Sequence, residues 1–338
     1  MKRAADPLPG PVPLGPTDRE LLEGVLQAQP RALAKTITLV ESTRADHQRR
    51  AQALLQMLLP HAGDAIRIGI SGAPGVGKST LVEALGLYTI EAGHRIAVLA
   101  VDPSSALTGG SILGDKTRME QLARSAQAYI RPSPSGGTLG GVAARTRECL
   151  LVCEAAGFDV IVVETVGVGQ SETAVAGMTD VFVLLQHPNA GDDLQAMKKG
   201  VVELADLILV NKADIDPQAA QRSQSQLESV LPLLRHRTSG WTPKVLVASA
   251  LKQQGIAELW NELGRFRASM QASGEFEERR RSQAVRWMWE IIESALREHF
   301  AADPGVKREL PALEAAVQQG SVAATVAAQR LLMLAGIR

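Results

Sequence analysis

Six short, almost continuously apolar stretches mark the middle of the chain, and segments with helical periodicity separate them. The apolar stretches are residues 66–70, 96–101, 158–164, 181–185, 204–210 and 245–250. Runs of this length, bounded by glycine, proline or acidic residues, are typical of strands that are buried on both faces of a parallel sheet. Strands that alternate with helices predict an α/β fold, in which a mostly parallel central sheet is flanked by helices.

The residues on both sides of this region predict helical extensions. Residues 1–16 are rich in proline and glycine, which predicts a mobile tail, and residues 17–62 repeat leucine and other apolar residues at helical spacing. All the predicted strands lie within residues 63–272, and residues 273–338 form a charged and then amphipathic C-terminal extension. Its apolar stripe, which packs either in a core or against a partner, consists of Val285, Met288, Trp289, Ile292, Leu296 and Phe300.

A phosphate-binding motif follows the first predicted strand. It consists of Gly72, Ala73, Pro74, Gly75, Val76, Gly77, Lys78, Ser79 and Thr80, and a helical pattern begins directly after it. A strand, the spacing G-x-x-x-x-G-K-[ST] and a helix together define the P-loop. Small residues let backbone N–H groups converge on phosphate oxygens, Lys78 supplies positive charge to the β and γ phosphates, and the Ser79 hydroxyl binds Mg²⁺. The sequence therefore predicts a P-loop NTPase.

Acidic residues near the ends of two further strands are candidates for the magnesium shell. Asp102 ends the second strand, where it is either a Mg²⁺ ligand or the start of a turn. Asp115 lies in a glycine-rich segment that is either a surface loop or a switch loop ordered by the γ-phosphate. Glu164 ends the third strand and begins an acid-x-x-Gly arrangement with Gly167, so that Glu164 can reach Mg²⁺ and the Gly167 N–H can sense the γ-phosphate.

The later part of the same region carries a guanine-recognition motif. Asn211, Lys212 and Asp214 follow the fifth strand as N-K-x-D. The Asp214 carboxylate can accept from the ring N–H and the exocyclic amine of guanine, a donor pair that adenine lacks. The sixth strand leads into Ser249, Ala250 and Leu251, where backbone N–H groups can meet the guanine carbonyl. The order of these motifs predicts that residues 63–272 form a GTPase domain.

Four residues are candidates for the hydrolytic step: Lys78, Asp115, Glu164 and Gln170. In Ras-type GTPases a glutamine close to the switch glycine orients the attacking water. Here Val168 follows Gly167 and its side chain forms no hydrogen bond, while Gln170 lies two residues further on. We therefore expect slow hydrolysis by the isolated protein and faster hydrolysis when a partner orders this segment.

The composition excludes several other classes. Lys plus Arg and Asp plus Glu both number 36, and aromatic residues make up 3% of the chain, which argues against nucleic-acid binding. No apolar run reaches membrane-spanning length and no signal-peptide core is present, so we expect a cytoplasmic protein without a membrane segment. Cys149 and Cys153, four residues apart on one helix face, are expected to be buried apolar residues, with a metal half-site or redox pair as the alternative.

Four stretches in combination resemble the MeaB/ArgK family of P-loop GTPases. They are residues 101–105, 109–118, 164–172 and 191–195, and the resemblance extends from about Asp18 to Phe300. It implies a homodimeric, metallochaperone-like GTPase that serves an adenosylcobalamin-dependent acyl-CoA mutase, chiefly methylmalonyl-CoA mutase. It also implies that the GTPase gates cobalamin delivery and protects or rescues the mutase, with GTP or GDP and Mg²⁺ as its own ligands and cobalamin as a ligand of the mutase.

The resemblance also implies roles for individual residues. It places Lys78, Ser79, Asp102, Asp115 and Glu164 near phosphate and Mg²⁺, and Asn211, Lys212 and Asp214 on guanine. Residues 186–199 resemble a third switch that relays the nucleotide state to the mutase, with Asp192, Asp193, Lys198 and Lys199 as the contact residues. The alternative is a kinase that transfers the γ-phosphate, a label carried by part of this family. A kinase needs an acceptor site and a catalytic base, and the sequence dedicates no segment to either.

Overall fold

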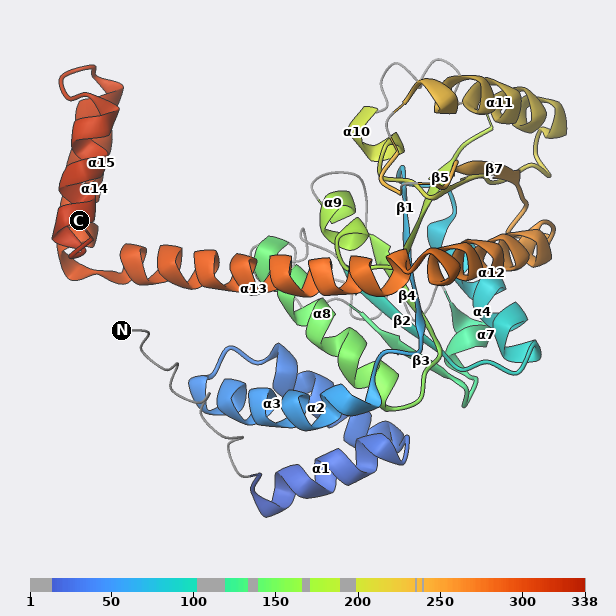
Figure 1. Cartoon of the computed structure of the whole chain (residues 1–338), viewed down its shortest axis with the longest axis horizontal. Coiled ribbons are helices and arrows are strands. Elements are labelled where there is room, and N and C mark those ends of the chain that lie inside the picture. Colours follow the sequence, from blue (N-terminus) through green and yellow to red (C-terminus); the bar gives the residue numbers. More distant parts are fainter. Residues whose placement is uncertain are drawn as a thin grey trace. The chain divides into compact units, whose positions relative to one another are not determined.

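The computed structural model describes residues 14–101, 119–132, 139–165, 171–188, 199–234, 236–238 and 240–337. Within these residues, parallel strands form one sheet in the order β3-β2-β4-β1-β5-β6-β7 (Figure 1). They are β1 (Ile66–Gly72), β2 (Ile96–Val101), β3 (Ala128–Arg131), β4 (Val160–Thr165), β5 (Val181–Gln186), β6 (Leu207–Val210) and β7 (Lys244–Val247). The predicted α/β fold class with a parallel central sheet is confirmed.

Three boundaries and one strand differ from the sequence prediction. β4 begins at Val160, two residues after the predicted start of the third strand. β6 begins only at Leu207, because Asp206 is used as a buried hydrogen-bond acceptor before the strand. Ser249 lies beyond the end of β7 and forms an isolated antiparallel bridge with Gln254 instead of extending the strand. The edge strand β3 was not predicted, since it has only four residues and only Ile130 among them is buried.

Helices cover both faces of the sheet (Figure 1). The helices between strands are α4 (Lys78–Glu91), α7 (Glu120–Ala123), α8 (Leu139–Ala155), α9 (Ser171–Ala176), α10 (Lys199–Val202) and α11 (Pro217–Val230), followed by the 3-10 turn η2 (Leu231–Leu233) and, after β7, by α12 (Ile256–Ser273). One apolar core joins the sheet to α4, α7 and α12, and the other joins it to α8, α9 and α11. The sheet is therefore buried on both faces, as its apolar strands predict.

Alternate residues of the central strands face these two cores. Ile70 belongs to the core under α4, whereas Val163 of the neighbouring strand belongs to the core under α8 and α9. Gly69 also faces the second core. A Cβ atom at Gly69 would lie 2.7 Å from Thr179 Oγ1 and 2.9 Å from Val175 Cγ1. Glycine at this position lets α9 pack directly against β1.

An N-terminal helical extension packs against α8. It consists of α1 (Pro16–Leu26), α2 (Pro30–Glu41), α3 (Ala45–Leu58) and the 3-10 turn η1 (Leu59–His61). Arg50 forms an ion pair of 2.7 Å with Asp18, which joins α3 to α1. Arg131 at the end of β3 forms a two-pronged ion pair with Glu41 at the end of α2. The extension is thereby bound to the sheet by charge as well as by apolar contacts.

Cys149 and Cys153 of α8 lie in the core that α8 shares with the sheet. Both are buried, and this burial raises the pKa of each thiol above its ordinary value. A buried thiol with a raised pKa is a poor nucleophile and a poor metal ligand. Burial therefore confirms that both cysteines act as small apolar residues.

The contacts of the chain divide it into a first unit, Met1–Arg280, and a second unit, Arg281–Arg338. Helix α13 (Glu275–Ala302) begins in the first unit, and α14 (Pro304–Gln318) and α15 (Ala324–Leu334) belong to the second. Of the predicted apolar stripe on α13, all the residues from Val285 to Leu296 are exposed. Among the helices of the described ranges, none has both the length and the apolar character needed to cross a membrane.

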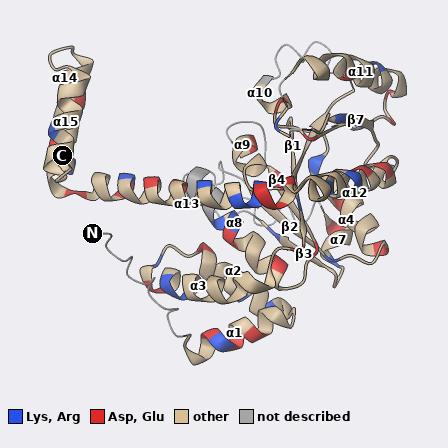
Figure 2. Cartoon of the chain, viewed as in Figure 1, with Lys and Arg blue, Asp and Glu red and all other residues tan. Residues whose placement is uncertain are grey.

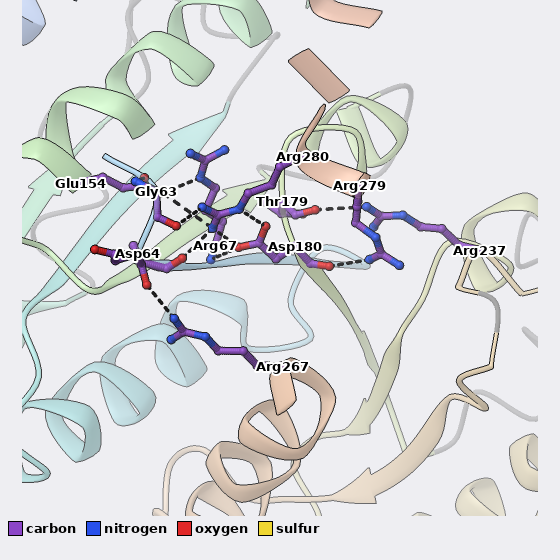
Figure 3. A network of polar contacts seen from close by, with 11 residues as sticks. Gly63, Asp64, Arg67, Glu154, Thr179, Asp180, Arg237, Arg267, Arg279 and Arg280 are labelled. Carbon is purple, nitrogen blue, oxygen red and sulfur yellow. Dashed lines mark hydrogen bonds and ion pairs between the residues drawn. The ribbon is translucent and has the colours of Figure 1, made fainter. Parts of the chain in front are cut away.

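The start of α13 is bound to the amino-terminal edge of the sheet through Arg280 (Figure 3). Arg280 donates to both carboxylate oxygens of Asp180, at 2.8 and 2.6 Å, directly before β5. It also donates to the carbonyl oxygens of Gly63 and Ala65, directly before β1, and lies 3.9 Å from Glu154. Acidic and basic residues stand side by side in this first part of α13 (Figure 2).

Arg279 extends this network to the next strand. It donates to the carbonyl oxygen of Asp180 and to Thr238 Oγ1, both at 2.5 Å, and lies 3.5 Å from Asp206. Asp206 directly precedes β6, is buried, and accepts from the Phe182 backbone N–H at 2.9 Å. Two consecutive arginines therefore bind the amino-terminal ends of β1, β5 and β6 to one helix.

Candidate functional site

The motifs singled out in the sequence meet at the carboxyl-terminal edge of the sheet. β1 ends at Gly72, where the phosphate-binding motif begins, and it pairs with both β4 and β5. Glu164 lies at the end of β4, and Asn211 directly follows β6. Because the strands are parallel, these ends lie at one edge, where open α/β sheets bind their ligands.

The loop of residues 72–77 is shaped for close approach of an anion. Gly75 and Gly77 have left-handed backbone conformations, with φ of 77° and 95°. No side chain forms a capping hydrogen bond with the backbone N–H groups at the start of α4. The Lys78 ammonium is buried and donates to the carbonyl oxygens of Gly72 at 2.9 Å and Ala73 at 3.2 Å. This arrangement concentrates positive potential at the loop, which suits phosphate.

Asn211 joins three segments of the candidate site. Its Nδ2 donates to the Val76 carbonyl oxygen at 2.8 Å, and its Oδ1 accepts from the Ala250 N–H at 3.0 Å. A Cβ atom at Gly77 would lie 2.7 Å from Asn211 Nδ2, so glycine is needed for this contact. Asn211 therefore fixes the distance between the phosphate loop and the predicted guanine-binding loops, a bridging role that the N-K-x-D spacing alone does not reveal.

The predicted specificity residue Asp214 is held by a neighbour. The Ser249 hydroxyl donates to Asp214 Oδ1 at 2.5 Å and accepts from the Lys252 N–H at 3.2 Å. Asp214 and Leu251 are both exposed. Lys212 has a left-handed backbone conformation, with φ of 64°. The Asp214 carboxylate is thus oriented while it faces the solvent, where it can accept the N–H groups of a base.

Ser79 and Glu164 bring two oxygen donors together. The Ser79 hydroxyl donates to Glu164 Oε1 at 2.9 Å, and Glu164 is 5% exposed. Mg²⁺ in phosphate-binding sites takes hydroxyl and carboxylate oxygens together with phosphate and water. The donor set of this pair fits that ion. In the part of the chain that the structure describes, no three His, Cys, Asp or Glu residues gather as a metal site.

Several of the predicted site residues lie outside the described residues: Asp102, Asp115, Gly167, Gln170, Asp192, Asp193 and Lys198. Lys199 is the first residue of α10, and only its backbone is described. Their roles stay predictions. The remaining members of the phosphate-binding motif, including Pro74 and Thr80, lie in the loop or in the first turn of α4 as predicted.

One buried pair near the site was not predicted. Thr165, the last residue of β4, donates through Oγ1 to Ser71 Oγ on β1 at 2.9 Å. Both side chains are fully buried. The only signal in the sequence is a hydroxyl residue at the end of each of two apolar strands, Ser71 directly before the phosphate-binding motif and Thr165 directly after Glu164.

Comparison with known proteins gives consistent matches over most of the chain. The family model described as methylmalonyl-CoA mutase-associated GTPase MeaB matches residues 33–305. A protein of Caulobacter vibrioides named "Putative GTPase" is 55% identical over 321 residues, which cover 95% of this chain and 98% of that protein. A protein of Mus musculus named "Methylmalonic aciduria type A homolog, mitochondrial" is 46% identical over 323 residues, covering 92% and 78% of the two chains.

A solved structure described as a LAO/AO transport system kinase is similar in both sequence and fold. It superposes with a TM-score of 0.78 and is 37% identical, and the match covers 95% of this chain and 98% of the other.

Proposed function

The chain belongs to the MeaB family of methylmalonyl-CoA mutase-associated GTPases, and from this premise we propose that it binds and hydrolyses GTP to regulate an adenosylcobalamin-dependent acyl-CoA mutase. The observation that carries the nucleotide part is the position of Asn211, which bonds to the phosphate loop at Val76 and to Ala250 of the predicted guanine loop. A single side chain thus sets the spacing between a phosphate site and a base site. Residues 63–272 form the GTPase domain in this proposal.

In the proposed complex, the phosphates lie in the loop of residues 72–77. The start of α4 and the Lys78 ammonium face them, and Lys78 exchanges its present carbonyl acceptors for phosphate oxygens. Asp214, oriented by Ser249, accepts from the ring N–H and exocyclic amine of guanine. Adenine offers no such donor pair, so ATP leaves this carboxylate without its partners.

Ser79 and Glu164 would hold Mg²⁺, with Asp102 and Asp115 as further candidate ligands. When bound, the ion neutralises the charge that develops on the phosphate oxygens during transfer to water. The Ser79 hydroxyl and the Glu164 carboxylate are already oriented toward each other before a ligand is bound. Gln170, Glu164 and Asp115 are the candidates for orienting the attacking water, and Val168 cannot do so.

The mutase and homodimer parts of the proposal rest on the family and on one surface. The family model names methylmalonyl-CoA mutase, and cobalamin would remain a ligand of that partner. Residues 186–199, with Asp192, Asp193, Lys198 and Lys199, would contact the mutase and relay the nucleotide state. The exposed apolar stripe of α13 offers a surface for self-association, because exposed Trp289 and Leu296 lose contact with water there.

The test is steady-state GTP turnover by the wild-type protein and by Glu164→Ala, with and without purified acyl-CoA mutases. We expect slow turnover alone and an increase on the order of 10–100-fold with the cognate mutase, about 1.4–2.7 kcal/mol of barrier. The Glu164→Ala variant should show neither the slow GTP turnover of the isolated protein nor the faster turnover with the mutase. Fast turnover by the isolated protein, or no response to any acyl-CoA mutase, would contradict a partner-gated GTPase.

A second assay separates this function from the kinase alternative, which the description of the solved relative suggests. The protein is incubated with γ-labelled GTP, the mutase and candidate acceptor proteins. Release of the label only as free phosphate supports the GTPase, whereas label bound to a protein supports a kinase.

A further inference from the structure

The hydroxyl pair of Ser71 and Thr165 lies beside the candidate magnesium site. Thr165 Oγ1 donates to Ser71 Oγ at 2.9 Å, and neither side chain is exposed to water. Ile70 is the register partner of Glu164 across the two parallel strands, so the hydroxyl pair joins the residues that follow these partners. Ser71 directly precedes the phosphate loop, and Thr165 directly follows Glu164.

We propose that Ser71 and Thr165 are positioning residues that fix the end of β4 to β1 and thereby hold Glu164 against Ser79. This inference rests on the proposed function, because it takes Ser79 and Glu164 as the magnesium site. Neither Ser71 nor Thr165 contacts the nucleotide in this proposal. Their effect passes through the backbone of Glu164.

Glu164 and Thr165 are consecutive residues of β4, and their side chains form hydrogen bonds on opposite faces of the sheet. Successive strand side chains point to opposite faces. Glu164 accordingly faces α4, where it accepts from Ser79 at 2.9 Å, and Thr165 faces the core under α8 and α9. A shift of the end of β4 along β1 therefore breaks both hydrogen bonds at once. The hydroxyl pair thus adds a second fixed point, next to the Ser79 contact, at the end of β4 that carries Glu164.

Apolar packing does not require hydroxyl groups at these two positions. The other residues of β4 are Val160, Ile161, Val162, Val163 and Glu164, and valine has nearly the shape of threonine. A buried hydroxyl adds no apolar area and must be hydrogen-bonded, but it fixes a direction that methyl groups do not. The pair is therefore better explained by positioning than by burial.

Helix α9, which begins directly after residues 166–170, also packs against β1. Those residues join Thr165 to Ser171, the first residue of α9. α9 packs on β1 at Gly69, where a Cβ atom would lie 2.9 Å from Val175 Cγ1. Both ends of this connection are thus held by the strand that leads into the phosphate loop. The hydroxyl pair is the end that is adjacent to Glu164.

The test compares Thr165→Val, Thr165→Ser, Ser71→Ala and the double variant Ser71→Ala/Thr165→Val with the wild-type protein. The first readout is the dissociation rate of fluorescent GDP with and without Mg²⁺, which reports on the ion without any turnover. The second is the dependence of GTP turnover on Mg²⁺ concentration. For Thr165→Val we expect the Mg²⁺ effect on GDP release to fall about 5–10-fold and kcat to fall about 10-fold, equivalent to about 1.4 kcal/mol of barrier.

The other variants separate positioning from stability. Thr165→Ser keeps the hydroxyl and should restore both readouts. The double variant leaves no unpaired hydroxyl, so it should unfold at a higher urea concentration than Thr165→Val but keep the Mg²⁺ defect. The matched control is Thr89→Val, which removes another fully buried threonine hydroxyl, bonded to Gly86 within α4 at 2.9 Å. It should lower stability without changing the Mg²⁺ dependence.

The outcomes distinguish this inference from the proposed function. If the wild-type protein shows no Mg²⁺-dependent GDP retention or GTP turnover, the proposed function fails. If the wild-type protein shows both and the double variant retains them unchanged, the positioning role is wrong. If Thr165→Val does not fold, Ser71→Ala and the double variant still show whether loss of the hydroxyl pair changes the Mg²⁺ dependence.

Discussion

Replacing Arg280 with glutamine removes the cation that binds the start of α13 to the sheet. Its guanidinium donates two hydrogen bonds to Asp180 and one each to the carbonyl oxygens of Gly63 and Ala65. Asp180 is 2% exposed, so water replaces the lost partner only in part. The Arg67 N–H, at 2.8 Å, remains as its described backbone donor.

Breaking a buried ion pair by removing one partner costs about 3–5 kcal/mol, because the other charge stays buried. The side chain of Arg280 is 14% exposed, which admits some water and places the expected loss near the lower end, at about 3 kcal/mol. Adding the second substitution Asp180→Asn to Arg280→Gln removes the negative charge that Arg280→Gln leaves without its cation. We therefore expect the double variant Asp180→Asn/Arg280→Gln to regain about 1–2 kcal/mol relative to Arg280→Gln.

The assay is urea unfolding, monitored by the exchange of the backbone amide hydrogens of β1 and β5. These strands belong to the first unit, so the readout reports on the stability of that unit alone. The matched control is Arg265→Gln, because Arg265 is 70% exposed and its partner Glu262, at 3.2 Å, is buried but also pairs with Lys244 at 2.8 Å. Loss of an exposed cation whose partner keeps another cation is expected to cost about 0–1 kcal/mol. If Arg280→Gln destabilises β1 and β5 no more than Arg265→Gln does, the network does not stabilise the sheet and the reasoning is wrong.

Other single substitutions test the nucleotide site and helix α8. Lys78→Ala should lower GTP affinity or turnover by about 100-fold with an unchanged circular dichroism spectrum, because the lost charge faces the ligand; wild-type turnover would contradict this role. Asp214→Asn should weaken GTP and improve XTP in calorimetric titrations, since xanthine carries a carbonyl where guanine carries its amine; an unchanged GTP affinity would place the base elsewhere. Burial raises the pKa of Glu148 from 4.5 to about 7, so the stability that its carboxyl contributes is present below pH 4.5 and is lost as pH rises through 7. Glu148→Gln should therefore stabilise the protein at pH 8 by at most about 3 kcal/mol and have little effect at pH 4, and a parallel shift at both pH values in urea unfolding would refute the assignment.

The strands buried on both faces were predictable because their apolar runs are continuous. β1, β2, β4 and β5 lie within two residues of the predicted runs, since every residue of these strands except Arg67 is buried. β3 was not predicted because an edge strand of four residues, of which only one is buried, has no clear pattern. Length and burial, rather than strand propensity, made the difference.

The candidate site was predictable as motifs but not as a set of contacts. The order of the P-loop, the acid at the end of β4 and N-K-x-D identified which residues gather at one edge of the sheet. The bond from Asn211 to Val76 spans 135 residues, and the bond from Thr165 to Ser71 spans 94. Such pairings depend on the register of neighbouring strands, which no local pattern in the sequence specifies. The same limit applies to Arg280 and Asp180, which are 100 residues apart.

The bond between Arg280 and Gly63 has a consequence for the protein during its synthesis, since the two residues are 217 positions apart. A ribosome adds about 5–20 residues per second, so Gly63 is made roughly 10–40 s before the guanidinium that binds it. Asp180 is made 100 residues before Arg280, so for roughly the last 5–20 s of that interval the nascent chain carries the acid before β5 without its cation. The sheet therefore reaches its full stability only when the first turns of α13 have left the exit tunnel, and a chain that is stopped earlier is exposed to proteases and chaperones with its central strands incompletely held.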